Sequence, residues 1–69
     1  LKERTMFKFL IHDRVKIVVS DEVGTIHARS EHESMEHQYL LRYKAADGRA
    51  CESWWCESAL VAVPFPVNN

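Results

Sequence analysis

Hydrophobic and polar residues alternate along several short stretches of the chain, which is the pattern of half-buried β-strands. The clearest case is the stretch 13–20, whose inward side is predicted to carry Val15, Ile17 and Val19. Alternate residues on a strand face opposite sides, so the residues between these three are expected to face outward. No stretch has the spacing of a long amphipathic helix, and the pattern therefore predicts an all-β chain.

A second strand is predicted over residues 25–29, with Ile26 and Ala28 directed inward and Arg29 directed outward. The turn that precedes it ends on Gly24, one of only two glycines. Glycine adopts conformations that other residues avoid, so Gly24 is placed where the chain is expected to reverse.

The third strand, residues 37–44, is predicted to have one apolar face and one mixed face. The inward residues are Tyr39, Leu41 and Tyr43, and the outward residues are Leu40, Arg42 and Lys44. An Asp47-Gly48 pair follows this strand, and such a pair supplies the positive φ that a tight hairpin requires. The chain is therefore expected to return as a fourth strand directly beside the third.

The fourth strand, residues 49–55, contains two adjacent tryptophans that must face opposite sides of the sheet. Cys51, Ser53 and Trp55 are assigned to the interior, because the first two are small and weakly polar. Glu52 cannot share a core cheaply without a partner, so the outward face is expected to carry Glu52 and Trp54.

The remaining segments complete the predicted organisation. They are an N-terminal extension over 1–12, a single helical or 3₁₀ turn over 56–60, a last short strand over 61–63, and a C-terminal tail over 64–69. Phe7 and Phe9 of the extension are expected either to cover one end of the core or to add a short edge strand. The domain itself is assigned to residues 13–63.

This order of elements resembles an SH3-like barrel. The stretches DRVKIVVSDEVGTIHAR, QYLLRYKAADGR and ESWWCESALVAV look like the small SH3-like proteins of tailed phages and prophages. They are more distantly similar to KOW and Tudor-type modules, in which a Tyr-x-x-x-Tyr strand meets an Asp-Gly turn and a tryptophan strand leads into Glu-x-x-Leu. The resemblance implies a five-stranded SH3-like barrel with a small accessory or host-interaction role. Because the sequence shows neither a membrane span nor a leader, the chain is expected in the cytoplasm of the host cell.

Composition and charge narrow the classes of partner. The chain has 69 residues, nine Lys and Arg against ten Asp and Glu, and a net charge of −1. One small domain is expected, and general binding to nucleic acid is not, because such binding neutralises many phosphates. A KOW-like nucleic-acid module using Lys8, Arg14, Lys16, Arg29, Arg42 and Lys44 is the alternative function. No apolar run approaches the roughly 20 residues of a membrane span, so no membrane contact is expected.

The candidate chemical groups do not predict an enzyme. Cys51 and Cys56 are expected to be free thiols, and their separation does not fit the close cysteine spacing of most zinc sites. A cysteine with a histidine, or Glu52 with Glu57, can be drawn as a catalytic pair, but no local signature supports either. We therefore expect no catalytic residue, metal, cofactor or small-molecule substrate.

The outward face of the third and fourth strands is the predicted partner-binding site. Its residues are Leu40, Arg42, Lys44, Glu52 and Trp54. Trp and Arg are the residue types most enriched at binding hot spots, and Arg42 is expected to stack beside Trp54. The sequence therefore predicts a non-enzymatic interaction module that binds a protein partner or forms a homodimer. In the alternative, Trp54 folds under Phe7 and Phe9 as a second small core.

Two further interpretations stay open. Tyr39, Tyr43 and Trp55, with Glu52 or Asp47, could line an aromatic cage for a methylated cation, as in Tudor modules. The loop 30–36 contains Glu31, Glu33 and Glu36, and is predicted to be solvated. With His32 and His37 beside these carboxylates, it could bind a basic partner more weakly near pH 6, when the histidines become charged.

Overall fold

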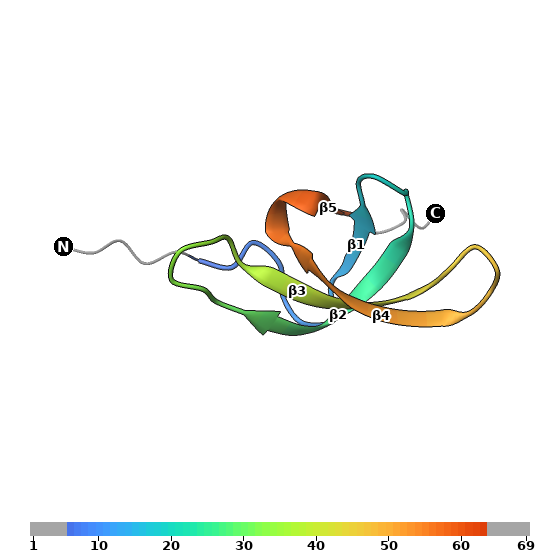
Figure 1. Cartoon of the computed structure of the whole chain (residues 1–69), viewed down its shortest axis with the longest axis horizontal. Coiled ribbons are helices and arrows are strands. Elements are labelled where there is room, and N and C mark those ends of the chain that lie inside the picture. The colour runs from blue at the N-terminus through green and yellow to red at the C-terminus, as the bar shows by residue number, and fades with distance from the viewer. Residues whose placement is uncertain (1–5, 64–69) are drawn as a thin grey trace, which may run out of the picture.

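Five antiparallel strands form one twisted sheet in the computed structural model, which describes residues 6–63 (Figure 1). The strands are β1 (Arg14–Ile17), β2 (Val23–Ser30), β3 (Gln38–Lys44), β4 (Ala50–Cys56) and β5 (Leu60–Ala62), with a 3₁₀ turn η1 (Glu57–Ala59) before β5. The predicted all-β class, the strand count and the single turn before the last strand are confirmed. The predicted tail at 64–69 lies outside the described residues.

The strand order is β4-β3-β2-β1-β5, so β4 and β5 are the two edges of the sheet. β2 holds the sheet together, because its first residues pair with β1 while nearly its whole length pairs with β3. β5 returns beside β1, and η1 connects it to the end of β4. The turn of the β3–β4 hairpin lies at one end of the long axis of the molecule, and the loop between β2 and β3 lies toward the other (Figure 1).

The core lies on one face of this sheet. Its buried hydrophobic side chains are Phe9, Val15, Ile17, Ile26, Tyr39, Leu41 and Leu60. Phe9 belongs to the N-terminal segment, which confirms that this segment covers part of the core. Phe7, Tyr43 and Trp55 pack against the cluster from its border and are only partly buried. Tyr43 and Trp55 were expected to be largely buried, but they lie on the hairpin, where β4 has no neighbouring strand on its far side.

The first strand is shorter than its hydrophobic pattern predicts. β1 ends at Ile17, and the carbonyl oxygen of Ile17 accepts hydrogen bonds from the amides of Ser20 and Asp21 at 3.2 and 2.7 Å. These bonds turn the chain immediately, with Asp21 at a positive φ of 66°. Val19, predicted to be buried, is therefore 80% exposed.

Gly24 serves a different purpose from the predicted one. It lies inside β2, opposite Val15 of β1 and Tyr43 of β3, rather than in the reversal itself. A Cβ atom at this position would lie 2.8 Å from the carbonyl oxygen of Arg42, which is closer than side chains tolerate. Glycine is therefore required here because two strands approach closely. The other glycine, Gly48, has φ 89° in the Asp47-Gly48 turn, as predicted.

A bulge in β2 reverses two predicted side-chain directions. The register with β3 shifts between Ile26 and Ala28, so that Ala28 lies opposite Leu40 and Arg29 lies opposite Tyr39. Residues opposite one another share a face, so Ala28 is on the outer face with Leu40, and Arg29 is on the core face with Tyr39. Strict alternation assigned both residues to the wrong side, because the bulge inserts an extra residue.

Substitution of Gly24 by alanine should lower the free energy of unfolding by about 1 to 3 kcal/mol, because the new Cβ forces β2 and β3 apart. Urea denaturation followed by tryptophan fluorescence measures this loss. Thr25→Ala is the matched control on the same strand, and should change the free energy of unfolding by less than about 1 kcal/mol. A Gly24→Ala variant as stable as the parent would contradict the close approach.

Candidate functional site

The five residues predicted to bind a partner lie together on the outer face of the β3–β4 hairpin. The opposed pairs are Leu40 with Trp54, Arg42 with Glu52, and Lys44 with Ala50. Opposed side chains of an antiparallel pair project from the same face of the sheet. These six residues therefore form one continuous surface, which we call the hairpin surface.

Trp54 is the principal apolar group of the hairpin surface. It is 48% exposed, whereas the adjacent Trp55 is partly buried and packs against the core. The Trp55 ring is fixed by a hydrogen bond that its Nε1 donates to the Ser53 Oγ at 2.9 Å. The prediction that Trp54 is the more exposed tryptophan is confirmed. The alternative, in which Trp54 packs under the N-terminal phenylalanines, is wrong.

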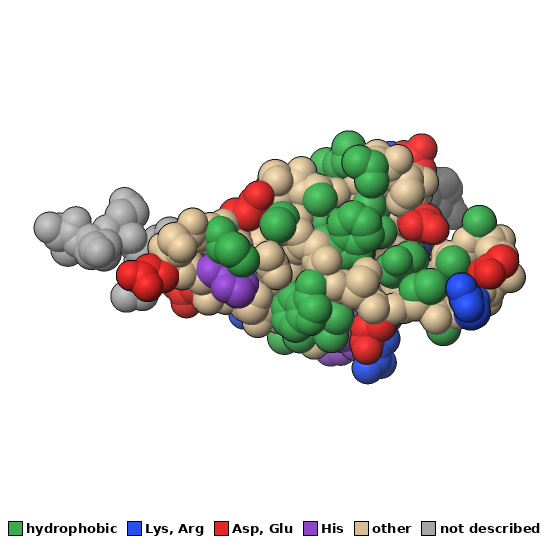
Figure 2. All heavy atoms as spheres, viewed as in Figure 1, with side chains coloured by type: hydrophobic (Ala, Val, Ile, Leu, Met, Phe, Trp, Pro, Cys, Tyr) green, Lys and Arg blue, Asp and Glu red, His purple; other side chains and the backbone are tan. Residues whose placement is uncertain are grey.

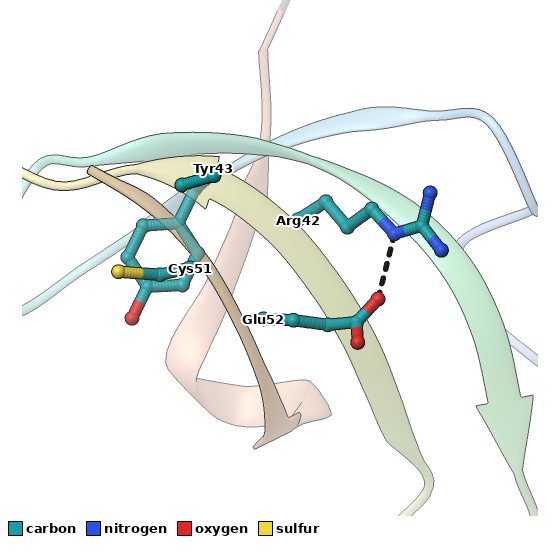
Figure 3. A pocket seen from close by; sticks show the side chains of 5 residues that line it. Arg42, Tyr43, Cys51 and Glu52 are labelled. Atoms are coloured by element: carbon teal, nitrogen blue, oxygen red, sulfur yellow. Dashed lines mark hydrogen bonds and ion pairs between the residues drawn. The ribbon is translucent and has the colours of Figure 1, made fainter. Parts of the chain in front are cut away.

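Arg42 does not stack on Trp54. Its Nε donates instead to the Glu52 Oε2 at 2.6 Å, and both side chains are well exposed (Figure 3). Among residues 6–63, the cation–π contacts are those of Lys8 with Phe9 and of Arg29 with Phe7. An exposed ion pair of this kind adds little stability. Its effect is to neutralise the charge of the hairpin surface directly beside Trp54.

A shallow depression of about 330 Å³ lies at the outer end of the hairpin. It is lined by Arg42, Tyr43, Ala50, Cys51 and Glu52. Figure 3 shows the Arg42 and Glu52 side chains on one side of the hairpin, and Tyr43 and Cys51 on the other. The polar groups do not converge on one point, as those of a small-molecule site do. The lining residues come from both strands of the hairpin.

A second polar cluster, which the sequence did not predict, lies on the core side. The Tyr39 hydroxyl donates to the Glu57 Oε2 at 2.5 Å, and accepts from the amides of Lys8 and Phe9 at 3.1 and 3.3 Å. The Lys8 amide also reaches the Glu57 Oε2, at 3.0 Å. Tyr39 thereby joins β3, η1 and the N-terminal segment. We call these groups, with His37, the Tyr39 cluster.

Both acids of the Tyr39 cluster have displaced pKa values. Burial and the hydrogen bond to Glu57 raise the pKa of Tyr39. Burial acts to raise the pKa of Glu57 as well. However, the hydrogen bonds from the Tyr39 hydroxyl and the Lys8 amide, with His37 nearby, outweigh burial and leave that pKa below its ordinary value. The cluster thus favours an ionised Glu57 beside a neutral Tyr39.

His37 completes the cluster and was placed wrongly by the sequence. It is buried, and its ring stacks on Phe7 with centroids 4.0 Å apart. Its Nδ1 lies 3.8 Å from the Glu57 Oε2, beyond hydrogen-bond distance. His37 is therefore not part of the exposed acidic loop. Since it is two residues before the inward-facing Tyr39, extending the alternation by one step would have placed it correctly.

Arg29 covers the other side of Phe7. Its guanidinium lies 4.3 Å from the centroid of that ring, and its Nη1 donates to the Phe9 carbonyl at 3.1 Å. The bulge in β2 makes this contact available, because it directs Arg29 to the core face. Phe7 is thus held between a histidine and an arginine, which fixes the N-terminal segment on the sheet.

The aromatic cage is not formed as a set. Tyr39 is fully buried in the core and its hydroxyl is occupied, whereas Tyr43 and Trp55 are only partly buried. A cage for a cation needs open ring faces around a common cavity. Tyr39 cannot contribute one, so a cage that uses all three residues is wrong.

Several basic side chains are already paired. Lys16 lies 3.6 Å from Asp21 and Arg49 lies 3.8 Å from Asp47. On the face shown in Figure 2, the scattered Lys and Arg side chains lie beside Asp and Glu, and no continuous basic surface is visible.

The acidic loop is exposed, and one of its carboxylates is engaged. Glu36 accepts hydrogen bonds from the amide and hydroxyl of Ser58, at 2.7 and 2.9 Å. Near the start of the loop, the Ser30 hydroxyl and the His32 Nε2 are 2.8 Å apart. The loop is therefore tied to η1 at its far end, which leaves Glu31 and Glu33 as its solvated charges.

Cys51 and Cys56 are free thiols at opposite ends of β4. Within residues 6–63, no three His, Cys, Asp or Glu side chains are grouped so that they could hold a metal ion. The same part of the chain has no helix long and apolar enough to cross a membrane.

Comparison of the chain with protein-family models, with curated proteins and with solved structures gave no match. The functional argument therefore depends on the geometry of the hairpin surface and of the Tyr39 cluster.

Tyr39→Phe should lower the free energy of unfolding by about 1 to 3 kcal/mol, because it removes the side-chain acceptor of the buried Phe9 amide and one of the hydrogen bonds to Glu57. Tyr43→Phe is the matched control. The Tyr43 hydroxyl is 3.5 Å from the Ser53 Oγ, so its loss should cost less than about 0.5 kcal/mol. Urea denaturation of both variants measures the difference. Equal losses would contradict the role given to the Tyr39 hydroxyl.

The free energy of unfolding should fall as the pH is lowered through the acid range. The pKa of Glu57 is lower in the folded chain than in the unfolded one, so the stabilisation is present above the ordinary carboxyl pKa and is lost below it. Glu57→Gln should be less stable near neutral pH and should show a flatter dependence on pH. The exposed Glu33→Gln is the control and should retain the parent slope. An unchanged slope in Glu57→Gln would contradict this assignment.

Proposed function

We propose that this chain is a non-enzymatic interaction module that binds a protein partner, or a second copy of itself, through the hairpin surface. The observation that carries the proposal is the position of Trp54, which is 48% exposed on an edge strand. A large aromatic side chain left at the surface beside polar residues is typical of a binding hot spot.

The neighbours of Trp54 suit contact with a protein. Leu40 is directly opposite and adds apolar area, while the Arg42–Glu52 ion pair borders the ring with no net charge. Interfaces commonly surround a few buried anchors with polar groups that remain hydrated. Trp54 and Leu40 supply the anchor and Arg42, Glu52 and Lys44 supply the rim.

The distribution of charge favours a protein partner over nucleic acid. Binding to phosphates requires Lys and Arg side chains that are not already paired with carboxylates. Here Arg42, Arg49 and Lys16 each lie beside a carboxylate, and Arg29 is occupied by Phe7 and the Phe9 carbonyl. These contacts support a protein-binding role over the KOW-like alternative.

The resemblance of the sequence to small SH3-like proteins of tailed phages leads us to propose the setting as well. In this proposal, the module is phage or prophage derived and acts in the cytoplasm of the host cell, on a protein or on itself. An active site is not part of it.

Trp54→Ala should weaken association by about 2 kcal/mol or more and leave folding nearly intact, whereas Trp55→Ala should damage folding itself. Association is measured by light scattering and sedimentation over a range of protein concentrations, and folding by thermal melts. The two tryptophans are adjacent in sequence, so each variant is the control for the other.

The proposal fails if Trp54→Ala associates like the parent chain while Trp55→Ala folds normally. It is also overturned if the parent chain stays monomeric and binds duplex DNA or RNA with submicromolar, salt-sensitive affinity in an anisotropy titration. That second result would favour the nucleic-acid module.

A further inference from the structure

The free edge of β4 presents backbone groups in a defined order. The Ala45 amide donates to the Arg49 carbonyl at 2.8 Å, and the Glu57 amide donates to the His37 carbonyl at 2.9 Å. These bonds mark both ends of the β3–β4 ladder, and hydrogen-bonded pairs alternate with non-hydrogen-bonded pairs between them. Cys51, Ser53 and Trp55 therefore direct their amides and carbonyls toward β3.

The residues between them direct their backbone groups away from β3. These residues are Ala50, Glu52, Trp54 and Cys56. Because β4 is the last strand of the sheet, their amides and carbonyls lie along an open edge. The Cys56 carbonyl is the exception, because Cys56 is the N-cap of η1 and its carbonyl accepts the first hydrogen bond of that turn. Among the turn and loop hydrogen bonds of residues 6–63, none involves Ala50, Glu52 or Trp54.

This edge lacks the features that usually prevent strand pairing. Natural edge strands are short, bulged, or carry proline or lysine. β4 has seven residues, contains neither proline nor lysine, and keeps a continuous register with β3. Its one charged side chain, Glu52, is neutralised by Arg42. The other edge strand, β5, has only three residues and so offers a much shorter template.

We infer that the partner of this edge is a second copy of the chain, whose β4 pairs with β4 in antiparallel register about a two-fold axis at Ser53. This inference rests on the proposed function and names the partner. In this register the opposed pairs are Ala50 with Cys56, Cys51 with Trp55, Glu52 with Trp54, and Ser53 with Ser53.

Two neighbouring registers are worse. An axis at Glu52 would place two carboxylates directly opposite one another, which is destabilising. An axis at Trp54 would leave Ala50 and Cys51 without a strand beside them. The axis at Ser53 pairs all seven residues and opposes no like charges.

In this register, the second copy provides the neighbouring strand that β4 lacks on its far side. Tyr43 and Trp55 are only partly buried because no strand lies beyond β4, and the second copy extends the core face past them. Three of the residues that line the depression in Figure 3, Ala50, Cys51 and Glu52, belong to this edge strand. In the paired sheet, Trp54 of the second copy lies beside Glu52 on the outer face. Trp55 of the second copy lies beside Cys51 on the core face. The second copy therefore contacts two of the residues that line the depression.

Disulfide cross-linking tests the register directly. Ser53 would form a non-hydrogen-bonded pair with its own copy, with Cα atoms about 4.5 Å apart, which lies within the range that a disulfide spans. In a full-length Cys51→Ser, Cys56→Ser background, the added Ser53→Cys should yield a covalent dimer under mild oxidation. It should form on the order of tenfold faster than in the matched Glu52→Cys variant, whose two copies do not meet at the axis.

Each outcome decides a different claim. If Glu52→Cys cross-links faster, or if neither variant does, the proposed edge pairing is wrong. If Ser53→Cys fails to cross-link but Trp54→Ala still weakens association, the hairpin surface binds through its side chains and only the edge inference fails. If Ser53→Cys cross-links and Trp54→Ala associates normally, the edge inference stands and the proposed use of Trp54 fails.

Discussion

The pairing of β3 with β4, in which Leu41 lies opposite Ser53, is the constraint on which the rest of the structure depends. It decides which residues of the hairpin enter the core and which remain outside, because a shift of one residue would exchange the two faces. It also decides which backbone groups of β4 are used by β3 and which are free. The core, the hairpin surface and the open edge are thus three results of one register.

The core that stabilises this register is small. Within residues 6–63 seven buried hydrophobic side chains form the interior, and the Tyr39 hydroxyl adds a polar junction at its border. That junction brings η1 and the N-terminal segment onto the end of β3. Its members come from three separate parts of the chain, so that the strands and the segments outside them stabilise one another.

Much of the fold could be predicted from local patterns. Strict alternation placed Tyr39 and Leu41 in the core, and Trp54 outside it, and the Asp47-Gly48 pair located the hairpin correctly. The errors arose where backbone geometry departs from alternation. The turn that closes at Ile17 exposed Val19, and the bulge in β2 exchanged the faces of Ala28 and Arg29. In this sequence the apolar residues continue to alternate past both places, at Ile17 and Val19 and at Ile26 and Ala28, so neither the turn nor the bulge could be foreseen.

The candidate site was predictable in part for the same reason. The hairpin surface follows from alternation alone, and all of its predicted residues share one face. The Arg42–Glu52 pair was not predicted, because sequence spacing does not show whether Arg42 contacts Glu52 or Trp54. The Tyr39 cluster was missed because it joins Glu57 and the Lys8 amide, which are far apart in the sequence. The open edge of β4 needed the strand order, which no local pattern contains.

Amide hydrogen exchange along β4, resolved by NMR in dilute solution where the chain is monomeric, tests this register most directly. The account predicts an alternation, with slow exchange at Cys51, Ser53 and Trp55, whose amides donate to β3. Exchange at Ala50, Glu52 and Trp54 should be at least about tenfold faster, because their amides face the open edge. The opposite alternation, with protected amides at Glu52 and Trp54 and rapid exchange at Ser53 and Trp55, would contradict it.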